Sequence, residues 1–181
     1  SETDRPLDYA GQGYDRVFVS AHFTLAAGLE IEELATNAAN LARNITLTGN
    51  SFAQIITGDI GANVLDGKGG LDTLVGGAGA DTFVFTSTLS AANVVTISDF
   101  AAGTDGIRLD DAVFAGLSTG VLATGAFTHG TDATTGEHRI VYDTSTGALY
   151  FDSDGVDGVA KIMFATVSTG LALYSGDFLV I

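Results

Sequence analysis

A nine-residue repeat constrains the fold of this chain more than any other feature. Four consecutive units align without gaps over residues 49–84 and read GNSFAQIIT, GDIGANVLD, GKGGLDTLV and GGAGADTFV. The first position is always glycine, the sixth always carries a side-chain oxygen, and the eighth is always large and apolar. Units this short cannot each bury a core, so they must stack on one another.

Each unit is predicted to be a six-residue turn followed by a three-residue strand. Glycine supplies the positive φ angles that such turns need. The eighth residue faces the interior while its neighbours face outward, as strand alternation requires. Two units make one rung, so turns two units apart stack on the same side. The sequence therefore predicts an all-β fold, a right-handed parallel β-roll with a β-rich C-terminal cap.

The stacked turns are predicted to bind Ca²⁺. Adjacent strands lie about 4.7–4.9 Å apart, and Ca²⁺ accepts oxygen ligands at about 2.3–2.6 Å. An ion between two stacked turns therefore meets oxygens from both rungs. The composition agrees, because Asp and Glu number 22 against 7 Lys and Arg, and most of these acids are Asp, a hard-oxygen ligand that favours turns.

The candidate ligands come from turns on the two sides of the roll. They are Asp59, Asn63, Asp66, Gly67, Gly69, Asp72, Gly76, Gly77, Gly79 and Asp81, with the glycines contributing backbone carbonyls. Turns 58–63 and 76–81 share one side, and turns 49–54 and 67–72 share the other.

We expect the strongest sites at Asp72 and Asp81. The first turn is expected to be the weakest, because Gln54 is neutral and Phe52 replaces a glycine. Two to four ions are expected, on the basis of roughly six to eight oxygens for each ion.

These units resemble the nonapeptide repeat of the RTX family of secreted bacterial proteins, most clearly over residues 76–83. The segment that follows, TISDFAAGTDGIRL at 96–109, resembles the strand–turn–strand that closes the roll in secreted metalloproteases of that family. There, an aspartate of this segment completes the last calcium site. The resemblance implies that Asp99 and Asp105 are further ligands, stacking on the turn of Asp72.

The segments before the repeat resemble longer, calcium-poor rungs. Residues 10–18 fit the template with Asp15 at the sixth position, which makes Asp15 a further candidate ligand. Residues 30–34 could instead form one short helix. The predicted organisation is degenerate rungs over 1–48, the calcium-binding roll over 49–84, and a closing segment, cap and secretion signal over 85–181.

The C-terminal region is predicted to contain a β-hairpin, with strands near 140–143 and 148–152 around a Thr-Ser-Thr-Gly turn. The DSDGVD segment that begins at Asp152 resembles the start of a calcium loop. Its twelfth position is Met163 rather than the glutamate of an EF-hand, so an acidic turn is favoured. Residues 175–181 resemble a type I secretion signal and are also compatible with a final edge strand.

Composition and motifs argue against several other functions. The formal net charge of −15 argues against nucleic-acid binding, and no apolar run is long enough to span a membrane. There is no cysteine, hence no disulfide framework. The three histidines His22, His129 and His138 do not form a His-Glu-x-x-His zinc motif. We therefore predict no catalytic site in this chain.

The predicted function is that of a calcium-dependent folding and export module. We expect the chain to be the C-terminal part of a larger secreted bacterial protein, located outside the cell or at its surface. Its expected partners are calcium ions and the type I secretion machinery. The alternative is an adhesin or carbohydrate-binding module that contacts a surface polymer through Tyr142, Tyr150 and Phe151, although core or cross-strand packing is the favoured interpretation of these rings.

Overall fold

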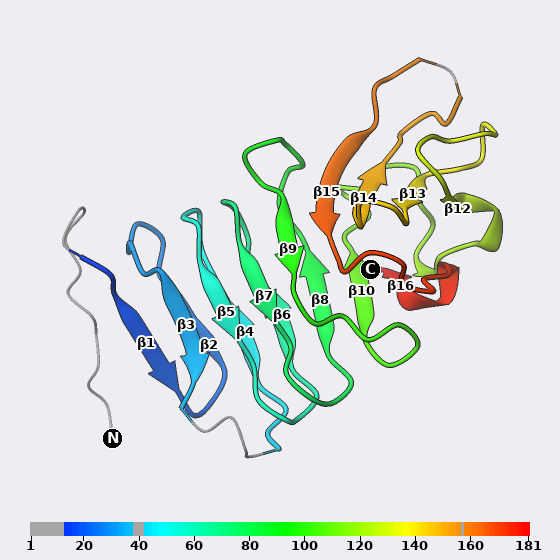
Figure 1. Ribbon diagram of the computed structural model, residues 1–181. Helices are drawn as coiled ribbons and strands as arrows, with labels where there is room; N and C mark the ends of the chain where they lie inside the picture. Colours follow the sequence, from blue (N-terminus) through cyan, green and yellow to red (C-terminus); the bar gives the residue numbers. More distant parts are fainter. Residues whose placement is uncertain (1–12, 38–41, 157) are drawn as a thin grey trace.

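The structure is a computed structural model that describes residues 13–37, 42–156 and 158–181. In this part of the chain the strands form two sheets, which face each other along a row of rungs (Figure 1). The N-terminal strands lie at one end of the row and the C-terminal cap lies at the other (Figure 1). The prediction of an all-β roll with a β-rich cap is confirmed.

The first sheet has nine strands among the described residues. Their spatial order is β1 (Arg16–Val19), β3 (Glu33–Thr36), β5 (Ile55–Thr57), β7 (Thr73–Val75), β9 (Val95–Ile97), β15 (Ile162–Thr166), β14 (Ala148–Phe151), β13 (Ile140–Asp143) and β12 (Phe127–His129). The strands β1, β3, β5, β7 and β9 are parallel. The cap strands continue the same sheet, because β15 pairs with β9.

The second sheet has seven strands among the described residues. Their order is β11 (Gly120–Val121), β16 (Phe178–Val180), β10 (Gly106–Leu109), β8 (Thr82–Phe85), β6 (Val64–Asp66), β4 (Thr46–Thr48) and β2 (Phe23–Thr24). Two short 3₁₀ helices, η1 (Thr124–Ala126) and η2 (Ser175–Asp177), lie in the cap. The chain alternates between the two sheets from β1 to β10, as a roll requires.

The eighth residues of the repeat form two apolar columns inside the roll. In the first sheet Ile56 pairs with Leu74, and in the second Leu65 pairs with Phe83. All four side chains are fully buried. Burying such a side chain contributes about 1.5–3 kcal/mol, so the columns supply the apolar driving force that one unit alone lacks.

The columns extend beyond the four units in both directions. Leu47 continues the column of the second sheet upstream by pairing with Leu65, and Leu34 continues that of the first sheet by pairing with Ile56. Because Leu34 lies in strand β3, the alternative of a short helix over 30–34 is wrong. The extended backbone of β3 places the Leu34 side chain inside the roll, in line with Ile56.

The cap has an aromatic core that adjoins the last rung. Phe114 packs edge-on against Phe151 and Phe164, with ring centroids 5.2 Å apart in both pairs. Phe85 of the last repeat strand packs against Phe164 at 5.1 Å. The predicted hairpin is confirmed as the antiparallel pair β13–β14. The aromatic contacts join the roll and the cap into one core.

The rings of the polymer-binding alternative lie largely in this core. Tyr142 is fully buried and Phe151 is buried. Tyr150 is half-buried, and the Lys161 Nζ lies 4.7 Å from its ring centroid. The packing interpretation of Tyr142 and Phe151 is therefore confirmed. No helix in the described ranges is long and apolar enough to cross a membrane.

Candidate metal centre

The turns of the repeat stack on the two sides of the roll as the spacing predicts. On one side, the Gln54 N–H donates to Asp72 Oδ1 at 2.8 Å. On the other side, the Asn63 N–H donates to Asp81 Oδ1 at 2.8 Å. Each bond joins sixth-position residues 18 positions apart. The sixth-position side chain of one turn therefore reaches the backbone of the turn one rung earlier.

The first-position glycines are required by the inward carboxylates. A Cβ on Gly67 would lie 2.2 Å from Asp72 Oδ2, and one on Gly76 would lie 2.4 Å from Asp81 Oδ2. Both distances are shorter than any non-bonded contact. The repeat therefore keeps glycine at the first position because the aspartate of the same turn folds back over it.

The inner oxygens of these two aspartates have no protein partner. Asp72 is 1% and Asp81 2% exposed, and the Oδ2 atom of each is buried without a hydrogen bond. A buried carboxylate oxygen without a donor is energetically costly. An unpartnered oxygen of this kind fits a metal ligand.

Burial also perturbs the acidity of both groups. It raises the pKa of Asp72 from 3.8 to about 7, against the lowering effect of the Gln54 N–H, and the nearby charge of Asp66 raises it further. Burial likewise raises the pKa of Asp81 to about 6, with smaller contributions from Asp105 and Asp99. Without a cation, the charged form of each side chain is disfavoured where it lies.

Asp99 and Asp105 contact the turn of Asp81. Asp99 accepts the N–H groups of Gly76 and Gly77 at 2.9 and 2.8 Å, and Asp105 Oδ1 accepts the Asp81 N–H at 2.9 Å. The expectation that they stack on the turn of Asp72 is therefore wrong. The closing segment between β9 and β10 passes on the side of turn 76–81, because it leaves the same sheet as that turn.

Two predicted ligands already have a cationic partner in the chain. Asp66 Oδ2 lies 2.9 Å from Lys68 Nζ and accepts a hydrogen bond from the Thr86 hydroxyl at 2.8 Å. Asp59 Oδ2 lies 3.6 Å from Arg43 Nε. Neither pairing was predicted from the sequence. The sequence offers a signal for the first pair, because Lys68 lies two residues after Asp66, but none for the second, because Arg43 lies 16 residues before Asp59.

In the first two turns the sixth-position amide donates to oxygens of its own turn. The Gln54 Nε2 donates to Asn50 Oδ1 at 2.7 Å. The Asn63 Nδ2 donates to the Gly61 carbonyl at 2.7 Å and to Asp59 Oδ1 at 3.2 Å. An amide at the sixth position thus supplies donors where Asp72 and Asp81 supply only acceptors.

The remaining turn carbonyls lie close to the next rung. A Cβ on Gly77 would meet the Asp59 carbonyl oxygen at 2.2 Å, and one on Gly79 would meet the Gly61 carbonyl oxygen at 2.6 Å. The Gly69 N–H donates to the Asn50 carbonyl at 2.8 Å. The approaches at Gly77 and Gly79 are possible only for glycine, which brings the carbonyls of one turn against the next turn.

No group of three or more His, Cys, Asp or Glu side chains gathers within the described ranges in a way that could hold a metal. The candidate sites thus combine one or two carboxylates with turn carbonyls. Such mixed oxygen sets, without nitrogen or sulfur, suit Ca²⁺.

Two further acidic segments stand apart from the stacked turns. Asp15 receives the Glu32 and Glu33 N–H groups at its carbonyl, at 3.2 and 3.1 Å; the start of its predicted unit, residues 10–12, lies outside the described residues. Asp152 Oδ1 accepts the Gly155 N–H at 2.8 Å. Asp157 of the same segment lies outside the described residues.

The parallel roll and its stacked glycine–aspartate turns define a module of the RTX type. The chain matches the family described as Peptidase M10 serralysin C terminal over residues 27–180, and it belongs to that family. The family is the non-catalytic C-terminal part of metalloprotease-type secreted proteins. No protein in a search of curated sequences matches the chain.

Proposed function

We propose that this module binds Ca²⁺ in its stacked turns and that binding drives its folding outside the cell. The observation that carries the proposal is the pair of buried, unpartnered oxygens at Asp72 and Asp81. The oxygens of these turns would be held in place by the two apolar columns, which fix the rung spacing.

The residues that would hold the ions divide between the two sides. Asp72 with the carbonyls of turns 49–54 and 67–72 would serve one side. Asp81, the carbonyls of turns 58–63 and 76–81, and at most one of Asp99 and Asp105 would serve the other. Bound calcium supplies positive charge that the protein lacks at these points. The Gln54 and Asn63 N–H groups each hold one carboxylate oxygen, which leaves the second oxygen of each aspartate without a hydrogen bond.

Calcium dependence follows from the charges of the turns. Asp66 lies near Asp72, and Asp99 and Asp105 lie near Asp81. Without a cation, the negative charges in each group repel one another in a buried setting. Binding free energy then becomes folding free energy. Extracellular calcium modules work at about 10⁻⁴–10⁻³ M, so a chain with this affinity stays destabilised at cytosolic calcium levels and folds after export.

Export by a type I system is the second part of the proposal. Residues 175–181 are the segment that resembles its signal. In the folded chain, β16 lies between β10 and β11, and Phe178 and Val180 are almost completely buried. A receptor could therefore bind this segment only before the cap folds.

Calcium dependence is tested by far-UV circular dichroism and thermal melts in chelator, in millimolar Ca²⁺ and in Mg²⁺. We expect a large rise of the melting temperature with Ca²⁺ alone. Asp72→Asn and Asp81→Asn should each lose part of that rise, because asparagine keeps one acceptor oxygen but not the charge. Asp111→Asn, an exposed acid of the cap, is the matched control. Equal melting temperatures of the wild type in chelator and in calcium would contradict the proposal.

Export is tested separately, in cells that carry a type I exporter. Deletion of residues 175–181 should abolish appearance of the chain in the medium, while Asp111→Asn should not. Accumulation of the deletion variant inside the cells separates a loss of export from degradation of an unfolded chain in the medium. Undiminished export of the deletion variant would contradict this part of the proposal.

The polymer-binding alternative gains no support from the arrangement of its residues. Tyr142 and Phe151 are buried, and Lys161 lies over the ring of Tyr150. A flat row of exposed rings, which saccharide binding would need, is not formed by these three side chains.

A further inference from the structure

Arg43 lies at a position that is equivalent to the fourth-position glycines Gly61 and Gly79 of the later turns. A Cβ on Gly79 would lie 2.6 Å from the Gly61 carbonyl oxygen, and a Cβ on Gly61 would lie 2.4 Å from the Arg43 carbonyl oxygen. The same stacking is thus repeated one rung earlier, at the same spacing. Arg43 therefore fills the fourth position of a turn that precedes the four recognisable units.

The sixth position of that earlier turn offers no ligand. The Ile45 N–H donates to Asn63 Oδ1 at 3.3 Å, which matches the bond from the Asn63 N–H to Asp81 Oδ1, and both span 18 residues. Ile45 is 3% exposed and has no side-chain oxygen. An ion between this turn and turn 58–63 would therefore lack the carboxylate that the later turns provide.

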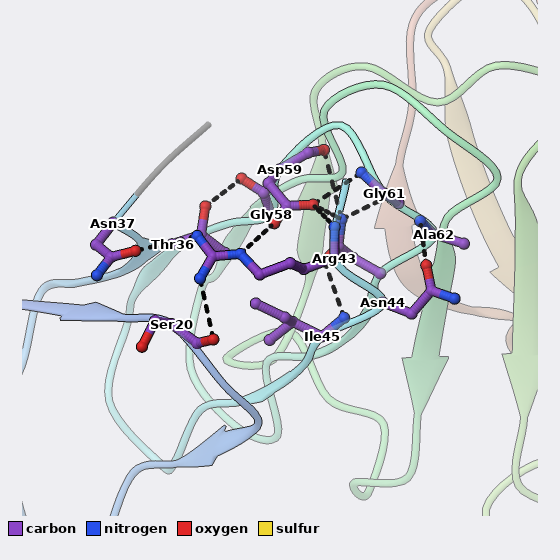
Figure 2. A network of polar contacts seen from close by, with 11 residues as sticks. Ser20, Thr36, Asn37, Arg43, Asn44, Ile45, Gly58, Asp59, Gly61 and Ala62 are labelled. Carbon is purple, nitrogen blue, oxygen red and sulfur yellow. Dashed lines mark hydrogen bonds and ion pairs between the residues drawn. The ribbon is translucent and has the colours of Figure 1, made fainter. Parts of the chain in front are cut away.

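The guanidinium of Arg43 lies next to the carboxylate of Asp59 (Figure 2). Its Nε is 3.6 Å from Asp59 Oδ2. Its Nη1 donates to the Ser20 carbonyl at 3.0 Å and its Nη2 to Asn37 Oδ1 at 3.1 Å. The backbone N–H of Arg43 also donates to Asp59 Oδ1 at 3.3 Å. The side chain is therefore fixed from three segments rather than extended into solvent.

Asp59 requires such a partner because its side chain is completely buried. Its Oδ1 accepts the Gly61 N–H at 2.8 Å and the Asn63 Nδ2 at 3.2 Å. Its Oδ2 and the Arg43 Nε are both buried without a hydrogen bond and lie 3.6 Å apart as an ion pair. A buried carboxylate persists in the charged form only when it is paired.

We propose that Arg43 is a built-in cation that takes the place of calcium at Asp59, so that the metal-binding column on this side begins only at the turn of Asp81. A divalent ion on Asp59 Oδ2 would lie within a few ångströms of the guanidinium, where two positive charges repel strongly. The turn of Asp59 therefore folds without metal. Asp59 itself, which the repeat pattern predicts as a ligand, is on this account a partner of Arg43. The inference rests on the proposed function for the calcium bound elsewhere in the column.

The first test counts calcium ions by equilibrium dialysis with ⁴⁵Ca²⁺. Asp59→Asn should bind as many ions as the wild type with unchanged affinity, whereas Asp81→Asn should lose an ion or bind it at least about tenfold more weakly. Loss of an ion in Asp59→Asn would overturn the inference. If the wild type binds no calcium at all, the proposed function fails rather than the role of Arg43.

The second test measures the pairing without calcium, so that it stands apart from metal binding. Arg43→Gln, Asp59→Asn and the double variant are melted in chelator. We expect each single change to lower the melting temperature, and the double variant to be less destabilised than the sum of the two. Additive losses would overturn the inference, because they would show that the two side chains do not depend on each other. The double variant also guards against a single change that leaves a buried charge and prevents folding.

Discussion

Turns 58–63 and 76–81 lie on the same side of the roll, one rung apart, and they differ in what satisfies their inner oxygens. In the earlier turn, the Asn63 Nδ2 donates to the Gly61 carbonyl, and Arg43 pairs with Asp59. In the later turn, Asp81 Oδ2 is buried without a partner. The same backbone shape is thus completed once from within the chain and once, on our account, by calcium.

The opposite side of the roll repeats the contrast. The Gln54 Nε2 donates to Asn50 Oδ1 in the earlier turn, whereas Asp72 Oδ2 in the later one has no donor. On both sides of the roll, the earlier turn has an amide at the sixth position and the later turn has an aspartate with an unpartnered oxygen. On the proposed function, the same repeat fold therefore carries turns that need no metal and turns that need calcium.

Among the predicted changes, removal of calcium should lower the stability of the protein most. Each ion contributes about 2.7 kcal/mol when free calcium is about 100 times Kd, which corresponds to about 5–10 °C in melting temperature for a chain of this size. With at least one ion on each side, chelation should lower the melting temperature by about 10 °C or more. Differential scanning calorimetry in chelator and in calcium at about 100 times Kd measures this. A shift that Mg²⁺ reproduces fully would contradict the assignment.

Gly77→Ala should break the contact between the two compared turns. Its φ is +96°, and a Cβ there would lie 2.2 Å from the Asp59 carbonyl oxygen. We expect a loss of about 3 kcal/mol or more in calcium, from strain and backbone displacement together. Gly103→Ala is the control, because Gly103 also has a positive φ of +77° but has open space around it, and should cost only about 1–2 kcal/mol. Urea denaturation compares the two, and equal losses would show that the turns are not in contact.

Asn63→Asp should convert the metal-independent turn into a metal-dependent one. The change removes the Nδ2 donor from Gly61 and adds a buried charge beside Asp59. We expect a loss of about 1–3 kcal/mol in chelator, which calcium partly restores. Asn44→Asp, an exposed change that keeps the oxygen accepting the Ala62 N–H, should show neither effect. If calcium restored none of the lost stability of Asn63→Asp, the proposal that a sixth-position aspartate makes a turn metal-dependent would be contradicted.

The last prediction concerns the pH dependence of stability in the metal-free protein. The folded pKa values of Asp72, about 7, and Asp81, about 6, exceed the ordinary 3.8. The folded state thus binds more protons than the unfolded state between these values, and stability falls as pH rises through them. Melts of protein stripped of metal, without chelator, should give a higher melting temperature at pH 5.5 than at pH 8. A rise toward pH 8 would contradict the burial of these charged groups.

The sequence was sufficient to predict the roll because its rule is local. Each eighth residue, such as Leu65 or Leu74, is apolar at fixed spacing, and strand alternation then determines which side chains face inward. The closing strand pair at 96–109 could also be predicted. The side of the roll on which this segment lies could not be predicted. The residues between β8 and β9 do not follow the nine-residue spacing, so the spacing does not indicate which turn Asp99 and Asp105 contact.

The candidate site was less predictable than the fold for a related reason. The repeat identifies residues that carry oxygen, but not the donors that other segments bring to them. Arg43 lies outside the four clear units, and Thr86 reaches Asp66 from the loop after β8. Whether an aspartate is left for a metal depends on such partners, which only the three-dimensional arrangement reveals.

The most direct test of the account is a crystal structure grown in calcium, with anomalous differences used to locate the ions. We expect anomalous peaks about 2.3–2.6 Å from Asp72 Oδ2 and Asp81 Oδ2, and no peak at Asp59 Oδ2, with Arg43 still paired to it. Peaks absent from Asp72 and Asp81, or a calcium ion on Asp59 with Arg43 displaced, would contradict it.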